Sequence, residues 1–284
     1  MSTLWRNVLE RIDPELFSLG SVSVSWYGVC FLLGGIVALV FFRRLTRRGA
    51  SEDRLTDGAF FDCAMLVTLG AVAGARIGYA AIYNPAFFLE YPLAIFSPFD
   101  PETGVWTGIA GMSAHGGMAG ALLGLWVFSR KERMLWWSLA DTLALSAPLA
   151  IFFGRIGNFL VGELPGRPTD ASWGIVFPRA LDGQLRHPSP LYEAFGEGLL
   201  LFLFLRLLSK KRRPPGELFA WSLGLYGAFR FALEYFREPD PQFGFFWGSF
   251  TMGQLWSLAL IAVSAPLIWW LRVRKSAILF PRRG

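Results

Sequence analysis

Apolar residues occur along this chain in runs of about twenty, separated by short polar segments. A helix needs about 20 consecutive apolar residues to cross the roughly 30 Å hydrocarbon core of a bilayer. The pattern therefore predicts an all-α, polytopic membrane protein, with about seven transmembrane helices in a single domain over residues 1–284. The predicted spans are Val22–Phe42, Ala59–Tyr83, Trp106–Phe128, Leu135–Phe159, Pro190–Leu208, Glu217–Phe236 and Phe250–Leu271.

The basic residues set the predicted orientation of these spans. Eighteen of the 27 Lys and Arg residues lie in the segments that follow the first, third, fifth and seventh spans, and six lie on the opposite side. Cytoplasmic loops are enriched in Lys and Arg, so the N-terminus is expected to be extracytoplasmic and the C-terminus cytoplasmic. The long segments 84–105 and 160–189 are then extracytoplasmic, and the second is expected to form a small folded arm.

Composition supports the membrane assignment. The chain is 54% hydrophobic and only 17% charged, whereas a soluble domain carries about 25% charged residues. The net charge of +6 comes from short clusters between apolar runs, where topology determinants belong, so we expect no nucleic-acid partner. Cys30 and Cys63 fall at different depths of consecutive antiparallel spans, so we expect neither a disulfide nor a metal site.

Polar side chains inside the spans gather toward one side of the bilayer. Ionisable groups are expensive there, and each one is a functional hypothesis by default. Six spans contribute polar residues to the outer layer, namely Tyr27, Arg76, His115, Arg155, Asn158, Glu193, Arg230, Glu234 and Arg237. Their convergence predicts a polar cavity between helices on the extracytoplasmic side.

Several of these residues also have a purely structural interpretation. Arg230 and Glu234 are spaced i, i+4 and could simply neutralise each other on one helix. Arg76 could have no role other than bridging two helices. Arg237, near a helix end, is expected to be a solvated interfacial charge. Arg155 has no acidic residue within one turn of its own helix, so we expect it to bind an anion. A phospholipid head group fits, because the guanidinium fork suits phosphate oxygens.

A series of motifs covers the whole chain. They are Ser25-Trp26-Tyr27-Gly28, Gly74–Tyr79, Ser113–Gly117, Gly154–Gly166, His187–Glu193 and Gly227–Arg230. In this order and at these spans, the chain resembles bacterial prolipoprotein diacylglyceryl transferases. It departs from the usual pattern at Val161, Ala114 and Pro190, where Asn, Phe and Gln are common. The segment from Phe177 to His187 is also shorter than in some members.

The resemblance implies a transferase of the bacterial inner membrane. Such enzymes move the diacylglyceryl group of phosphatidylglycerol to the lipobox cysteine thiol of a preprolipoprotein, which forms a thioether and releases glycerol phosphate. No metal or cofactor is implied. Arg155 and Arg230 would hold the phosphate and stabilise its departing charge, and His115 would deprotonate the thiol, a task open also to Glu193 or Glu234. The implied substrate-binding residues are Arg155, Asn158, Tyr27, Arg76, Glu163, Gly166, Glu193 and Glu234.

Two other classes of protein were considered. A transporter of a small organic anion could line its path with the three in-span arginines, but it needs access to both faces, commonly through internal repeats. No repeat is evident, and the inner halves of the spans carry almost no charge. An intramembrane protease needs a Ser/His, paired-Asp or zinc constellation. The chain has two histidines and no His-Glu-x-x-His motif.

Overall fold

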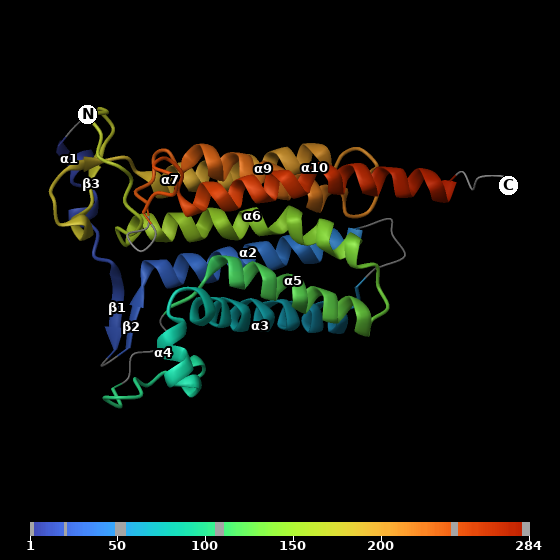
Figure 1. The fold of residues 1–284 in the computed structure, drawn as a ribbon, viewed down its shortest axis with the longest axis horizontal. Coiled ribbons are helices and arrows are strands. Elements are labelled where there is room, and N and C mark those ends of the chain that lie inside the picture. The colour runs from blue at the N-terminus through green and yellow to red at the C-terminus, as the bar shows by residue number, and fades with distance from the viewer. Residues whose placement is uncertain (1–2, 20–21, 49–54, 106–110, 240–243, 280–284) are drawn as a thin grey trace. The chain divides into compact units, whose positions relative to one another are not determined.

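The computed structural model describes residues 3–19, 22–48, 55–105, 111–239 and 244–279. Its chain divides into two compact units (Figure 1). Unit 1 comprises Met1–Arg44 and Asp141–Gly284, and unit 2 comprises Leu45–Ala140. Each unit contains its own helix contacts and is described in turn below.

Unit 1 begins with short elements that the apolar runs did not predict. They are α1 (Thr3–Arg6), the 3-10 helix η1 (Leu9–Arg11) and an antiparallel hairpin of β1 (Glu15–Leu19) and β2 (Val22–Ser25). Helix α2 (Trp26–Arg48) therefore starts at Trp26 and not at Val22. The Val-Ser-Val-Ser sequence of β2 alternates with period two, which suits a strand. The expectation of an all-α fold is correct for the long elements and wrong for these hairpin residues.

The other long helices of unit 1 follow the predicted spans closely. They are α6 (Trp136–Leu160), α9 (Glu217–Leu233) and α10 (Met252–Leu279). The fifth expected span is helical in three consecutive pieces: α7 (Ser189–Glu193), the π-helical η4 (Ala194–Leu200) and α8 (Leu201–Leu208). A π-helical stretch inside an α-helix often marks a functional site.

Glycines allow the helices of unit 1 to pack closely. A Cβ built on Gly34 of α2 would lie 2.9 Å from Cβ of Phe153 on α6, and one on Gly227 of α9 would lie 2.8 Å from the Ser257 carbonyl oxygen of α10. Figure 1 shows α9 and α10 running side by side. The hydroxyl of Ser264 also donates to the Ala220 carbonyl at 2.8 Å. These contacts hold α6 against α2 and α9 against α10, and α6 and α9 carry Arg155, Asn158 and Arg230 of the predicted site.

The segment 160–189 is folded. It contains β3 (Ile175–Val176), the 3-10 helix η3 (Pro178–Ala180) and β4 (Leu185–Arg186), and β3 pairs with β4. Its core is apolar, because Ile175 and Phe177 are buried against Leu9 and Phe159. The beginning of the chain and the end of α6 thus hold this segment in place.

Unit 2 consists of α3 (Asp57–Ile82), α4 (Pro85–Glu90), the 3-10 helix η2 (Pro92–Ile95) and α5 (Ala114–Lys131). The third expected span began at Trp106, but residues 106–110 lie outside the described residues and α5 starts only at Ala114. The Ser113 side chain caps this start by accepting from the Gly116 amide at 3.3 Å, a common way of satisfying free N–H groups at a helix N-terminus.

Helices α3 and α5 run side by side (Figure 1). They meet along a seam of glycines spaced four residues apart. The seam consists of Gly70, Gly74 and Gly78 on α3 and Gly116, Gly120 and Gly124 on α5. A Cβ on Gly74 would lie 2.8 Å from Cα of Gly120, and a Cβ on Gly78 would lie 2.8 Å from Cα of Gly116. Small residues at this spacing let helix backbones approach each other in apolar surroundings.

Within the described residues, four helices are long and apolar enough to cross a membrane. They are residues Trp26–Arg47 of α2, Asp57–Ile82 of α3, Trp136–Leu160 of α6 and Met252–Arg274 of α10. The other three expected spans are also helical, with 18 residues in α5 and 17 in α9. The chain is therefore mainly helical, with two small hairpins, and several of its helices have membrane character.

Candidate active site

A cluster of paired charges lies among α6, η4 and α9 of unit 1. Its members are three arginines, Arg155, Arg230 and Arg237, and three glutamates, Glu193, Glu197 and Glu234. We call this set the ionic cluster. Glu193 and Glu197 come from the helical run 189–208, Arg155 comes from α6, and the remaining three come from α9 and the residues directly after it.

Glu193 is the centre of the ionic cluster. One carboxylate oxygen lies 2.9 Å from Nε of Arg155, and the other lies 3.2 Å from Nη1 of both Arg230 and Arg237. Its side chain is 1% exposed. A carboxylate this deeply buried needs such partners, because an unpaired charge would be strongly destabilising there. Glu193 therefore joins three segments of unit 1.

Glu197 is a second buried carboxylate, and the sequence analysis missed it. It lies within η4 and is fully buried. Its Oε2 lies 3.5 Å from Nη2 of Arg155, and its Oε1 lies 3.3 Å from Nη1 of Arg230. The signal was available, since an acidic residue inside an apolar span is itself a functional hypothesis and Glu197 follows Glu193 by one helical turn.

Arg155 has no acidic residue nearby on its own helix, but Glu193 and Glu197 reach it from another helix. One expectation about the arginines is wrong. Arg237 was expected to be solvated, yet it is buried and donates to Glu193. The ion pair of Arg230 with Glu234 is confirmed at 2.7 Å.

Residues at the start of α10 also contact Glu234. The hydroxyl of Thr251 donates to it at 3.0 Å. Gly253 lies so close that a Cβ there would be 2.7 Å from the carboxyl carbon of Glu234. The α9–α10 packing thus fixes the carboxylate that orients Arg230.

Segment 160–189 contacts the ionic cluster through the residues that follow α6. The Arg167 amide donates to the Phe236 carbonyl at 2.9 Å, and its guanidinium donates to the Arg237 carbonyl at 3.0 Å. Gly166 lies in this contact, and a Cβ on it would be 2.7 Å from both the Phe236 carbonyl oxygen and Cβ of His187. The geometry gives Gly166 a packing role, because no larger residue fits.

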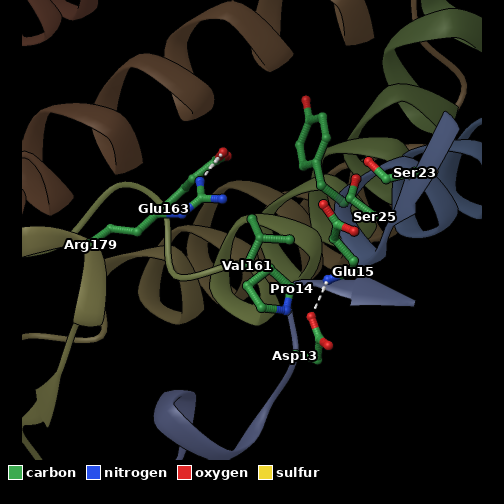
Figure 2. Close-up of a pocket in the computed structure, with 9 residues that line it drawn as sticks. Asp13, Pro14, Glu15, Ser23, Ser25, Val161, Glu163 and Arg179 are labelled. Carbon is green, nitrogen blue, oxygen red and sulfur yellow. Dashed lines mark hydrogen bonds and ion pairs between the residues drawn. The ribbon is translucent and has the colours of Figure 1, made fainter. Parts of the chain in front are cut away.

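A cavity of about 500 Å³ lies between the β1–β2 hairpin and the residues that follow α6 (Figure 2). Its lining is mainly polar and consists of Asp13, Pro14, Glu15, Ser23, Ser25, Tyr27, Val161, Glu163 and Arg179. Figure 2 shows Glu163 and Arg179 pointing toward each other, with their ion pair at 2.7 Å. Glu163 also accepts from the Asn158 side chain at 3.1 Å. Three residues predicted for substrate binding, Tyr27, Asn158 and Glu163, are therefore neighbours of this cavity or line it.

The remaining two predicted residues, Arg76 and His115, belong to unit 2. Arg76 is buried and donates to the carbonyl oxygens of Ala94 at 2.8 Å and Ile95 at 3.0 Å, which supports a structural bridge between α3 and η2. His115 lies in the first turn of α5 with an exposed side chain. Its glycine neighbour Gly116 packs against α3. The approach of Arg76 and His115 to the ionic cluster stays a prediction.

Comparisons with known proteins agree with the motif series. A family model described as prolipoprotein diacylglyceryl transferase matches residues 14–270. The chain is similar to phosphatidylglycerol–prolipoprotein diacylglyceryl transferases of several bacteria. It is 41% identical to that of Cupriavidus metallidurans, covering 92% of this chain and 93% of the relative. It is 42% identical to that of Campylobacter hominis, covering 91% of each chain, and 42% identical to that of Geobacter sulfurreducens, covering 88% and 92%. With its apolar helices and the paired charges of its ionic cluster, this chain is a multi-pass membrane protein that belongs to the prolipoprotein diacylglyceryl transferase family.

Proposed function

We propose that this chain transfers the diacylglyceryl group of phosphatidylglycerol to the lipobox cysteine thiol of a preprolipoprotein. A thioether forms and glycerol phosphate is released. The family match over residues 14–270 and the names of the relatives support the reaction. One observation carries the assignment of the site: the guanidinium groups of Arg155 and Arg230 meet at the same two buried carboxylates.

In this mechanism Arg155 and Arg230 bind the phosphate of the lipid. A guanidinium has five N–H donors, and the ion pairs of Arg155 use only Nε and Nη2 within the part of the chain that the structure describes. The ionic cluster holds three arginines and three glutamates, so it is formally neutral. Capture of an anion then depends on the direction of the N–H donors and not on excess positive charge. Preorganised donors of this kind can also stabilise the charge that develops in a transition state.

The chemical step is a substitution at the glyceryl carbon. The cysteine loses its proton, its sulfur attacks the carbon, and the carbon–oxygen bond breaks so that glycerol phosphate leaves with the electron pair. We assign the proton to His115, because a thiolate is the reactive form and a histidine accepts protons near neutral pH. Glu193 and Glu234 are both engaged by arginines, which leaves them less suited to this task.

The other predicted residues would position substrates. Tyr27, Asn158 and Glu163 surround or border the polar cavity, which can accept a hydroxylated head group or the peptide chain. Gly166 would keep the segment after α6 close to the ionic cluster. Arg76 would keep η2 against α3.

The reaction also implies a topology. We propose seven spans in the bacterial inner membrane, with the N-terminus and segments 84–105 and 160–189 on the extracytoplasmic side and the C-terminus in the cytoplasm. The distribution of basic residues supports this orientation. A reporter fused after Lys211 should behave as cytoplasmic, and one within Asp170–Arg186 as extracytoplasmic. The opposite pattern would overturn the proposed orientation.

Reconstitution tests the activity directly. The purified protein is mixed with phosphatidylglycerol vesicles and a lipobox peptide, and the peptide is analysed by mass spectrometry. We expect a mass increase of one diacylglyceryl group on the cysteine, release of glycerol phosphate, and no product from a matched peptide with serine at that position. Flux of an anion across the vesicle membrane without thioether formation would favour a transporter instead.

A further inference from the structure

Glu197 is a charged group that the proposed mechanism does not use. It lies within the apolar run 189–208 and is fully buried. Burying a carboxylate costs free energy unless guanidinium or other donors compensate for the lost water. Glu197 meets that requirement through its two ion pairs, with Arg155 and with Arg230.

The two oxygens of Glu197 serve different arginines. Oε2 faces Nη2 of Arg155 and Oε1 faces Nη1 of Arg230, at 3.5 and 3.3 Å. These arginines come from α6 and α9, two helices separated by more than 50 residues of chain. Two guanidinium groups repel each other, and a carboxylate between them reduces that repulsion at short range. Glu197 therefore sets how closely the two guanidinium groups approach and which donors they turn away.

The backbone around Glu197 is firmly located between the same two helices. On one side, a Cβ on Gly198 would lie 2.7 Å from Cα of Phe152 on α6. On the other side, a Cβ on Gly196 would lie 2.8 Å from Cδ1 of Leu233 on α9. The π-helical geometry of η4 brings both glycines and the carboxylate into this narrow space. Because its backbone is confined in this way, the Glu197 carboxylate keeps a fixed position relative to the two arginines.

Glu193 provides the contrast. It also contacts Arg155 and Arg230, but it has Arg237 as a third partner. Arg237 forms a β-bridge with Gly166, so Glu193 also ties the arginines to the segment after α6. Among the described residues, the ion pairs of Glu197 are with Arg155 and Arg230 alone. A change at Glu197 should therefore affect the two arginines more selectively than a change at Glu193.

We propose that Glu197 is a positioning residue that aligns the guanidinium groups of Arg155 and Arg230 for the phosphate of the lipid. The proposal rests on the proposed function. Glu197 acts through the two arginines and does not itself need to touch the substrate. Misplacement of a binding group by about 1 Å can reduce catalysis on the order of 10²-fold, which gives the size of the expected effect.

The test compares Glu197→Gln and Glu197→Asp with wild type in the reconstituted transfer assay, with the melting temperature measured in detergent. Glu217→Gln is a matched control, because Glu217 is also buried and paired with Arg213 and Arg272 at the other end of α9. We expect Glu197→Gln to lower kcat/KM for phosphatidylglycerol on the order of 10²-fold, with a raised KM for the lipid and KM for the peptide little changed. Glu197→Asp, which keeps the charge, should recover part of the loss. Glu217→Gln should leave both KM values near those of wild type.

A double-mutant cycle separates positioning from general damage. If Glu197 acts through Arg155, then adding Glu197→Gln to Arg155→Lys should reduce transfer much less than it does in wild type. Equal losses in both backgrounds, or wild-type KM for the lipid in folded Glu197→Gln, would overturn the proposal. If Glu197→Gln does not fold, Glu197→Asp provides the test by itself. A wild-type KM for the lipid in Glu197→Asp would then overturn the proposal. Failure of the proposed function looks different, because the wild-type protein itself would then form no thioether.

Discussion

The ionic cluster of unit 1 and the glycine seam of unit 2 solve the same problem in opposite ways. Both bring apolar helices together where burial of apolar surface gives little driving force, since lipid tails are as apolar as the side chains. In the glycine seam, α3 and α5 meet backbone to backbone, and no side chain separates them at the contact. In the ionic cluster, charged side chains from α6, η4 and α9 fill the space and pair with one another.

The two contacts should therefore fail for different reasons. The glycine seam depends on size, because any Cβ would overlap with backbone that cannot move aside. The ionic cluster depends on charge balance and direction, because each buried carboxylate is compensated by guanidinium groups. The glycine seam is rigid and carries no reactive group, so it suits a structural role. The ionic cluster is neutral and contains strong donors and acceptors, so it can rearrange when a phosphate binds. Substitutions in the glycine seam and in the ionic cluster test this difference and should have the largest effects, whereas changes at exposed residues outside both contacts should have smaller ones.

Gly120→Leu should have the largest effect. Its Cβ would lie 3.0 Å from Cα of Gly74 and closer still to the Gly70 backbone, so α3 and α5 must separate. Overpacking of a tight contact typically costs about 1–3 kcal/mol and occasionally more, and here, where backbone meets backbone, we expect loss of folded protein. Gly58→Leu is the matched control on α3, because a Cβ there meets no heavy atom within 4 Å. The yield of folded protein and the melting temperature in detergent are compared for the two variants. Equal values would contradict the steric interpretation.

Glu193→Gln tests charge balance at nearly constant size. Removing one partner of a buried ion pair costs about 3–5 kcal/mol, and this change leaves the ionic cluster with one excess positive charge. Adding Arg237→Gln should recover part of the lost stability, because it restores neutrality although it removes a second ion pair. Thermal unfolding of the single and double variants measures this. Further destabilisation by the second change would show that the individual contacts matter and the charge balance does not.

His115→Gln should lose most transfer at neutral pH while the protein keeps its stability, because the side chain is exposed. If His115 is the base, raising the pH toward the thiol's own pKa of about 8.5 should recover part of the rate, since the thiolate then forms without help. Single-turnover transfer across pH, with lipid affinity measured in parallel, provides the test. A deficit that is constant with pH, accompanied by weaker lipid binding, would assign His115 to head-group binding.

Asp182→Asn should have the smallest effect, confined to segment 160–189. The Arg186 guanidinium donates to Asp182 at 2.6 Å, and this bond, together with the Gln184 amide, lowers the pKa of the carboxyl. A lowered pKa in the folded state stabilises the segment above the ordinary pKa of about 3.9, and that contribution is lost as the pH falls through the folded-state value. Amide exchange in the segment should therefore rise below pH of about 4 in wild type. In Asp182→Asn this rise should be smaller, and an identical rise would exclude Asp182 as its source.

Much of the helical fold could be predicted from the sequence. The apolar runs located every long helix, because span length is a local property of composition. They misplaced some ends: α2 continues to Arg48 and α10 to Leu279, past the expected Phe42 and Leu271, and α5 starts later than expected. The β1–β2 hairpin was missed although Val22–Ser25 alternates with period two, because its residues were included in an apolar run. The π-helical geometry of η4 had no clear sequence signal, since it depends on how Gly196 and Gly198 pack against neighbouring helices.

The candidate site was predictable only in part. Arg155 and Arg230 stand out in the sequence as charges in apolar runs, and both lie in the ionic cluster. Their partner Glu197 was missed, because it lies 42 residues from Arg155 and 33 from Arg230. The burial of Arg237 was missed for the same reason, as its partner lies 44 residues away. Spacing along one helix reveals local pairs such as Arg230 with Glu234, whereas pairs between helices depend on the tertiary fold.

The affinity of Arg155→Lys for phosphatidylglycerol tests the central proposal most directly. Lysine keeps the positive charge and the neutrality of the ionic cluster but loses the planar fork with its bidentate donors. We predict affinity for phosphatidylglycerol in nanodiscs to fall roughly 10-fold or more, in line with the loss of one charge-assisted hydrogen bond of about 1.5–3 kcal/mol. The protein should remain folded, which its melting temperature measures in parallel. A folded Arg155→Lys protein that binds phosphatidylglycerol as tightly as wild type would contradict the assignment of the ionic cluster as the phosphate site.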